Sequence, residues 1–191
     1  MTLSPASTEL GFFRSSESRD SKYDPAAIGL AFSGGGYRAS LFHAGAVIRL
    51  NELGILSKAS RIASVSGGSI TTGILATNWD KIDWNGKSEG VATHEAMTEH
   101  FIKPLMDATS LSIDVGVSIL GFVPGISGGN QLARSYDKHI FHHKKLNTIT
   151  DSRRFLFCAA NLQTGGLVRF TKDYVADWQA FFSTTHNIKL S

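Results

Sequence analysis

Two glycine-containing loops, 30 residues apart, constrain the fold of this chain more than any other feature. The first loop, Ser33–Arg38 (SGGGYR), follows the short apolar run Ile28–Phe32, and the second, Ser64–Gly68 (SVSGG), closes another such run. Between them, Tyr37–Leu53 contains no proline and is typical of a helix. This order predicts one β-α-β unit, with both loops at the carboxyl ends of neighbouring parallel strands, where open α/β sheets place their sites.

The remaining segments continue the α/β pattern. At 191 residues the chain suits one domain, or most of a larger one. We expect residues 1–24, rich in serine and mixed charges, to be a flexible lead-in, and residues 25–191 to form the domain. Helices are expected over Ser69–Asn78, Val91–Met106 (broken or bent at Pro104) and Asn130–His143. Strands are expected over Phe155–Leu162 and Leu167–Lys172, around a turn at Gln163–Gly166.

The composition is that of a globular protein, with 42% apolar and 18% charged residues. The net charge of +3, without a long Lys/Arg block, argues against a nucleic-acid partner and leaves attraction to an anionic membrane surface open. The single cysteine, Cys158, excludes an intrachain disulfide and a cysteine-based zinc site. Because we find no signal-peptide pattern and no apolar run of roughly 18 to 20 residues, we expect a cytoplasmic protein with, at most, peripheral membrane contact.

One segment, Ser112–Gly129, interleaves apolar residues with glycines and is too short to span a bilayer. A buried irregular segment is the plainer interpretation. An apolar lid over an acyl site is the alternative.

The second loop has the pattern of a nucleophilic serine on a sharp turn. Such a serine needs small residues two positions before and after it, and Ser66 has Ser64 and Gly68 there. The backbone N–H of Gly67 and the start of the following helix would face a developing oxyanion. Taken alone, this loop favours a plain β-α turn over a nucleophile.

The first loop is suited to an anion. Its three consecutive glycines, Gly34, Gly35 and Gly36, leave backbone N–H groups free to converge on a phosphate or an oxyanion, and Arg38 adds a positive charge. The spacing also fits a dinucleotide-binding fingerprint, which expects an acidic residue at the end of the next strand. That strand ends in Ser64–Ser66 instead, so the dinucleotide interpretation is disfavoured.

Together, the two loops predict an acyl-transfer site. Ala31–Ala39 followed by Ser64–Ser69 resembles the patatin-like phospholipase family, and Asn161–Gly165 with Arg169-Phe170 is similar to its bacterial members. The resemblance runs from about Ile28 to about Asp177.

This resemblance implies a three-layer α/β/α fold with a mainly parallel central sheet and hydrolysis of acyl esters, often of phospholipids or lysophospholipids. It also implies a Ser–Asp dyad, without cofactor or metal. By position, Ser66 would be the nucleophile, and Gly34, Gly35, Gly36 and Gly67 would form the oxyanion hole. Arg38 would steady that loop or the anion.

The expected base of the dyad is missing. The family places an aspartate in an Asp-Gly motif late in the domain, whereas this chain contains no Asp-Gly dipeptide, so we expect the domain to be cut short at its C-terminal end. Substitutes can be proposed, but none sits in the expected turn: Asp114, Asp151, Asp173 and Asp177. Asp177 followed by His186 has the chain order of a hydrolase triad and is a further alternative.

The histidines suggest little further chemistry. His139, His142 and His143 have helical spacing and could contact one metal ion, although a solvated basic helix face is favoured. His43, within an apolar helix, is interpreted as a hydrogen-bonded core residue.

The sequence therefore favours a serine acyl hydrolase acting on lipid esters. A non-catalytic lipid-binding fragment is the first alternative, because the base is missing. A nucleotide- or phosphate-binding β-α-β protein is the second.

Overall fold

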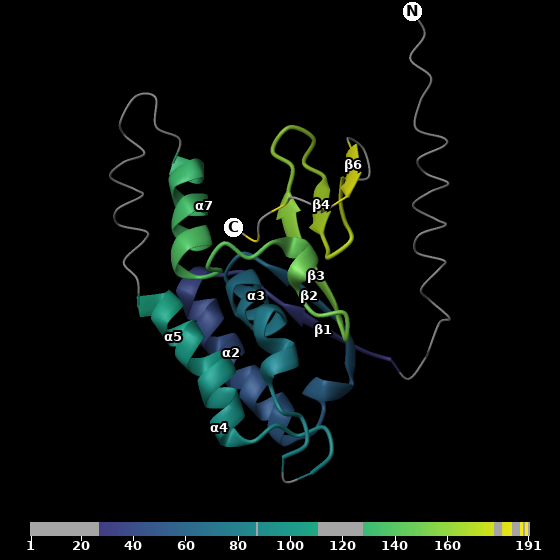
Figure 1. Ribbon diagram of the computed structural model, residues 1–191. Helices are drawn as coiled ribbons and strands as arrows, with labels where there is room; N and C mark the ends of the chain where they lie inside the picture. The colour runs from purple at the N-terminus through teal and green to yellow at the C-terminus, as the bar shows by residue number, and fades with distance from the viewer. Residues whose placement is uncertain are drawn as a thin grey trace, which may run out of the picture.

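The computed structural model describes residues 27–86, 88–110, 128–177, 181–184, 188 and 190. The predicted lead-in over residues 1–24, residues 112–127 of the glycine-rich segment, Asp114 and His186 lie outside these residues. The described part holds a six-stranded sheet whose strands lie side by side in chain order, with helices packed against it (Figure 1). The predicted α/β class is confirmed.

The sheet changes direction halfway along. β1 (Ile28–Phe32), β2 (Ala59–Val65) and β3 (Arg154–Ala160) are parallel, and β4 (Leu167–Phe170), β5 (Tyr174–Asp177) and β6 (Phe181–Thr184) continue it antiparallel. Parallel neighbours need long crossovers, which the helices supply, whereas antiparallel neighbours need only short turns. The predicted parallel part is thus the first three strands, and the predicted hairpin joins β3 to β4.

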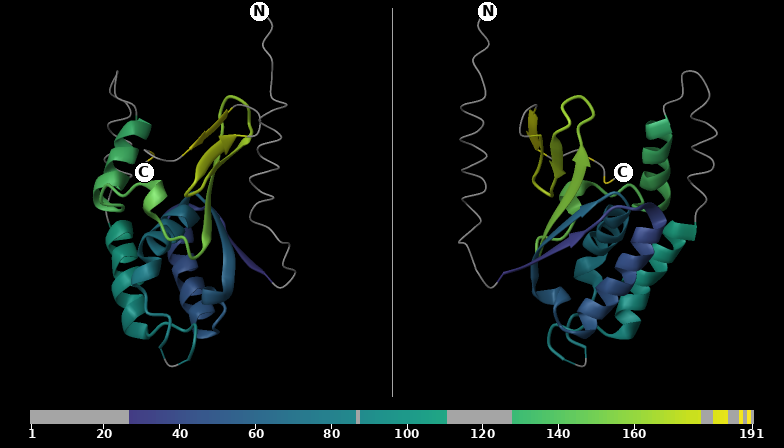
Figure 2. Two further views of the ribbon diagram at one scale, coloured as in Figure 1. Left: turned by 45° about the vertical axis from the view of Figure 1, so that its right-hand side comes forward. Right: turned by 180° about the vertical axis from the view of Figure 1, so that it is seen from behind.

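The helices cover one face of the parallel strands (Figure 2). The crossovers from β1 to β2 and from β2 to β3 run in the same direction along the sheet. Because such crossovers are right-handed, both place their helices on the same face. Within the described ranges, two layers of the expected three-layer arrangement are present. The helical elements are α2 (Gly36–Glu52), η1 (Leu56–Lys58), α3 (Gly67–Asn78), η2 (Trp79–Lys81), α4 (His94–Met97), η3 (Thr98–Ile102), α5 (Lys103–Ser110), α7 (Gly128–His139) and η4 (Leu146–Thr148).

The helix expected over Val91–Met106 has different bounds. α4, the π-helical turn η3 and α5 follow one another without a gap, so the helical run continues past Pro104 to Ser110. A π-helical turn is one of the usual ways in which a helix accommodates a local irregularity. It lies directly before the turn that contains Pro104, in place of the predicted break.

The core lies between the helices and the sheet. Its most buried side chains, at most 1% exposed, include Val47 of α2, Ile74 and Leu75 of α3 and Ile62 of β2. Both α2 and α3 therefore pack into the same core. The packed α2–α3 pair fixes the positions of the two glycine loops, which directly precede α2 and α3.

Among the helices the structure describes, none is long and apolar enough to cross a bilayer.

Candidate active site

The second loop forms a strained turn at Ser66. β2 ends at Val65 and α3 begins at Gly67, which leaves Ser66 between them with φ 53° and ψ −124°. A non-glycine residue with such a backbone conformation costs about 1–3 kcal/mol and persists only where the surrounding structure enforces it. The turn therefore has the geometry expected of a nucleophile elbow.

The two loops touch through their glycines. A Cβ atom on Gly67 would lie 2.2 Å from the carbonyl oxygen of Gly36, and one on Gly68 would lie 2.6 Å from that of Phe32. These neighbours are backbone atoms, so no side chain can move aside. On the other side of the contact, a Cβ atom on Gly34 would lie 3.1 Å from Cβ and 3.7 Å from Oγ of Ser66. The structure thus brings the two predicted loops into direct contact around Ser66.

Two helices begin at this contact. Gly35, with φ 138°, precedes α2, Ser66 precedes α3, and no side chain caps either helix. The first turn of a helix leaves backbone N–H groups without helical partners and carries the positive end of the helix dipole. Since Gly36 and Gly67 meet, both first turns direct this positive potential to the neighbourhood of Ser66.

A cluster of hydroxyl groups stabilises the turn at Ser66. Ser64 is 4% exposed, and its Oγ accepts hydrogen bonds from Thr72 Oγ1 at 2.7 Å and from Ser69 Oγ at 3.2 Å. The buried Ser40 hydroxyl of α2 donates to the Gly67 carbonyl at 2.8 Å. Serine thus serves at position 64, where the usual pattern has glycine, because its hydroxyl ties the end of β2 to α3.

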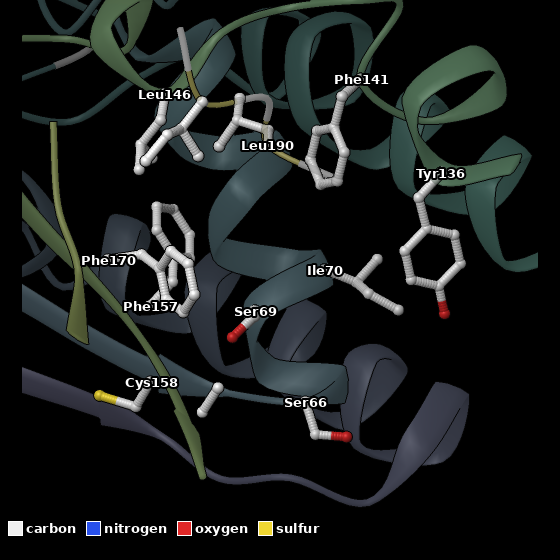
Figure 3. A pocket seen from close by; sticks show the side chains of 12 residues that line it. Ser66, Ser69, Ile70, Tyr136, Phe141, Leu146, Phe157, Cys158, Phe170 and Leu190 are labelled. Carbon is white, nitrogen blue, oxygen red and sulfur yellow. The ribbon is translucent and has the colours of Figure 1, made fainter. Parts of the chain in front are cut away.

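Ser66 stands between two cavities. The first, of about 290 Å³, extends over Ile70, Phe141, Phe157 and Leu190 and is mainly apolar, with Ser66 and Cys158 at its edge (Figure 3). The second, of about 360 Å³, is lined by both glycine loops and by α7. Three residues line both cavities: Ser66, Ile70 and Tyr136. No charged side chain of the described residues lines either cavity.

The environment of Cys158 differs from that of an activated thiol. Cys158 lies on β3 beside the end of β2, and burial raises the pKa of its thiol, against a smaller opposing effect of the Arg169 charge. A raised pKa keeps the thiol protonated and weakly nucleophilic at neutral pH. Cys158 therefore lines the apolar cavity as a neutral thiol.

The candidate bases that the structure describes, Asp151, Asp173 and Asp177, line neither cavity. Asp177 is 1% exposed on β5, where Asn161 Nδ2 donates to its Oδ2 at 2.8 Å. Asp151 forms an ion pair with Lys172, and Asp173 follows Thr171 in the turn before β5. Among the described residues, no carboxylate or imidazole lines either cavity.

Arg38 and the three histidines considered as metal ligands line neither cavity. Arg38 is exposed in the first turn of α2 and lines neither cavity. α7 ends at His139, and His142 and His143 have positive φ values of 48° and 61°, so the three histidines do not share a helix face. No group of three metal-ligating side chains was found in the part of the chain that the structure describes.

Sequence reasoning missed most of the cavity wall. Ile70 and Tyr136 fall within two of the helices that the sequence predicts, and Phe141, Leu146 and Phe157 carry no motif. Their signal is ordinary hydrophobicity, which does not distinguish a cavity wall from a filled core.

Comparison with known proteins identifies relatives of the segment that holds both loops. The family profile described as the lysophospholipase catalytic domain matches residues 28–117. Lysophospholipase 1 of Candida albicans is 50% identical over 60 residues, which cover 27% of this chain and 10% of that protein. Lysophospholipase 2 of Candida albicans is 49% identical over 59 residues, with the same coverage. The matched region thus spans about a tenth of the length of these relatives.

A solved structure with a similar arrangement is human GIVD cytosolic phospholipase A2, in complex with methyl gamma-linolenyl fluorophosphonate. It aligns with a TM-score of 0.47 and 17% sequence identity, over 79% of this chain and 23% of that one. The profile match, together with the two lysophospholipases, agrees with the resemblance that the two loops predicted. Residues 28–117, a little under half of this chain, are thus similar to the lysophospholipase catalytic domain, in line with the predicted resemblance to the patatin-like phospholipases.

Proposed function

We propose that this chain carries the nucleophile and oxyanion hole of a lipid acyl hydrolase of the phospholipase A or lysophospholipase type, with Ser66 as the nucleophile. The observation that carries the proposal is the strained Ser66 backbone at the point where two uncapped helices begin and an apolar cavity opens. A plain β-α turn would require none of these three features together.

The proposed reaction uses the Ser66 hydroxyl and the backbone N–H groups of the two glycine loops. Ser66 Oγ attacks the acyl carbonyl carbon, and the carbonyl oxygen becomes an oxyanion that accepts hydrogen bonds from backbone N–H groups of Gly34–Gly36 and Gly67. The bond from the acyl carbon to the alcohol oxygen breaks, and the alcohol leaves with the proton that Ser66 Oγ loses. Water then hydrolyses the acyl-enzyme, which releases the fatty acid and returns a proton to Ser66 Oγ. Arg38, exposed at the start of α2, would add positive charge at the rim rather than a hydrogen bond inside the hole.

The two cavities suit the two halves of an ester. The apolar cavity beside Ile70 and Phe157 would hold the acyl chain, because its lining offers no charge and little hydrogen bonding. The cavity along Gly36, Tyr37 and Gly67 would hold the alcohol side. Ser66 lies between them, as an atom attacking the ester carbonyl must.

The proposed substrate class rests on the relatives, and the proposed cellular location of the protein rests on the exposed surface of α2. A phospholipid or lysophospholipid supplies the acyl ester that the printed names of the relatives indicate. On α2, Leu41 and Phe42 are 52% and 74% exposed two turns from the glycine loop, which supports peripheral contact with a lipid surface. We propose a cytoplasmic location with such contact.

A second candidate is lipid binding without catalysis. It is favoured by one observation, that no base among the described residues lines the cavities. A serine hydroxyl without a base to accept its proton is a poor nucleophile.

Labelling with a fluorophosphonate tests the proposal. We expect a covalent adduct on Ser66 by mass spectrometry, lost in Ser66→Ala and retained in Ser60→Ala, a control serine that is exposed on β2 and lines neither cavity. Turnover of a short-chain ester should likewise be lost in Ser66→Ala and retained in the control variant. Labelling without turnover would favour the lipid-binding candidate, and absence of labelling in the folded chain would refute Ser66 as nucleophile.

A further inference from the structure

His43 connects α2 back to the loop from which α2 emerges. It lies two turns into α2, its side chain is 6% exposed, and its Nε2 is 2.9 Å from the carbonyl oxygen of Ser33 and 3.4 Å from Ser33 Oγ. A carbonyl oxygen only accepts, so Nε2 carries the hydrogen and donates it. The interpretation of His43 as a hydrogen-bonded core residue is confirmed.

The partner of His43 belongs to the peptide unit that ends in Gly34. The carbonyl of Ser33 and the N–H of Gly34 lie in one rigid plane and point in opposite directions. Fixing the direction of that carbonyl therefore fixes the direction of the Gly34 N–H. Gly34 is also the loop residue that lies against Ser66, as the 3.7 Å from its Cβ position to Ser66 Oγ shows.

The same carbonyl is held from a second side. A Cβ atom on Gly68 would lie 2.7 Å from the Ser33 oxygen, so the first turn of α3 packs closely against it. The imidazole itself is held edge-on by Phe32 and Phe42, at centroid distances of 5.1 and 5.6 Å. Neither the ring nor the peptide can turn without breaking one of these contacts.

We infer that His43 is a positioning residue that aims the Gly34 N–H at the oxyanion formed on Ser66. This inference rests on the proposed acyl-transfer function. It assigns the imidazole no proton transfer, because His43 lines neither cavity. Its effect is on the direction of one hydrogen-bond donor, which matters more in the transition state than in substrate binding.

Two amide variants of His43 distinguish the effect of losing the Nε2 hydrogen-bond donor from the effect of changing the size of the side chain. The Gln amide nitrogen can reach the position of Nε2, whereas the Asn amide, one methylene shorter, cannot. We expect His43→Gln to keep most of the labelling rate and turnover. We expect His43→Asn to lower kcat about 10- to 100-fold, less than the roughly 10²- to 10³-fold loss seen when an oxyanion donor is deleted, with KM within a few-fold of wild type.

A direct measurement of the Gly34 amide makes the test independent of activity. In a ¹⁵N-labelled chain, His43→Asn should shift the Gly34 amide resonance and speed its hydrogen exchange, and His43→Gln should restore both. If wild type is not labelled by the fluorophosphonate, the proposed function fails while the amide measurement still tests His43. An unchanged Gly34 amide in folded His43→Asn, or equal loss of rate in both variants, would overturn the inference.

Discussion

Replacement of Gly67 by alanine is the sharpest test of the contact between the two loops. The new Cβ atom would lie 2.2 Å from the oxygen, 2.9 Å from the carbon and 3.0 Å from the nitrogen of Gly36. An unstrained contact needs roughly 3.5 Å, so the loops must separate by about 1 Å. Overpacking of this kind costs about 1–3 kcal/mol, and a 1 Å misplacement of reacting groups costs about 100-fold in rate.

Gly45 provides the matched control for this glycine-to-alanine change. It lies in the interior of α2 and is exposed, and a Cβ atom there would meet nothing within 4 Å. Alanine at this position should stabilise the protein by about 0.5–1 kcal/mol, because glycine loses more backbone entropy on folding.

The assay compares thermal melting with fluorophosphonate labelling below the melting transition. At roughly 2–4 °C per kcal/mol, we expect Gly67→Ala to lower the midpoint by several degrees and labelling by about 100-fold. Gly45→Ala should raise the midpoint slightly and label at the wild-type rate. If folded Gly67→Ala labels Ser66 as fast as wild type, the loop contact does not set the geometry of the site and the reasoning is wrong.

Three further outcomes are expected. Ser66→Gly should abolish labelling yet raise stability by about 1 kcal/mol in denaturant unfolding, because glycine adopts φ 53° without strain. Gly73→Ala, whose Cβ would lie 2.8 Å from the Phe141 ring, should displace that ring and slow labelling by long-chain fluorophosphonates more than by short-chain ones. Alkylation of Cys158 should be slower than that of a free cysteine at pH 8, and should keep rising at higher pH, because burial raises its pKa and lowers the thiolate fraction.

Local sequence was sufficient for the parts of the fold that depend on neighbouring residues. The strand endings before Gly34 and Ser66 could be predicted because a short apolar run followed by small residues has few alternatives. His43 could be recognised as a core residue because apolar positions surround it on the helix. In each case the physical cause lies within a few residues of the effect.

The cavity walls depend on contacts between distant segments, and the sequence does not encode these locally. Tyr136 and Phe157 lie next to Ser66 only because α7 and β3 pack there. The helix predicted over Asn130–His143 ends at His139, and beyond it His142 and His143 take left-handed conformations that do not continue a helix. The sequence predicts the four-residue strand β4 because the glycine-containing turn at Gln163–Gly166 precedes it. It does not predict β5 and β6, which are equally short and follow segments without such a turn signal.

The order of the strands has a consequence for how the molecule assembles. Pairing Phe32 with Ser64 closes a loop of about 32 residues, whereas pairing Val65 with Cys158 closes one of about 93, at an entropic cost about 1 kcal/mol larger. The unit that contains both glycine loops can therefore form before β3 arrives. In a partly folded molecule of this kind, the turn at Ser66 would already be formed while β3, which supplies part of the wall of the apolar cavity, is still unpaired.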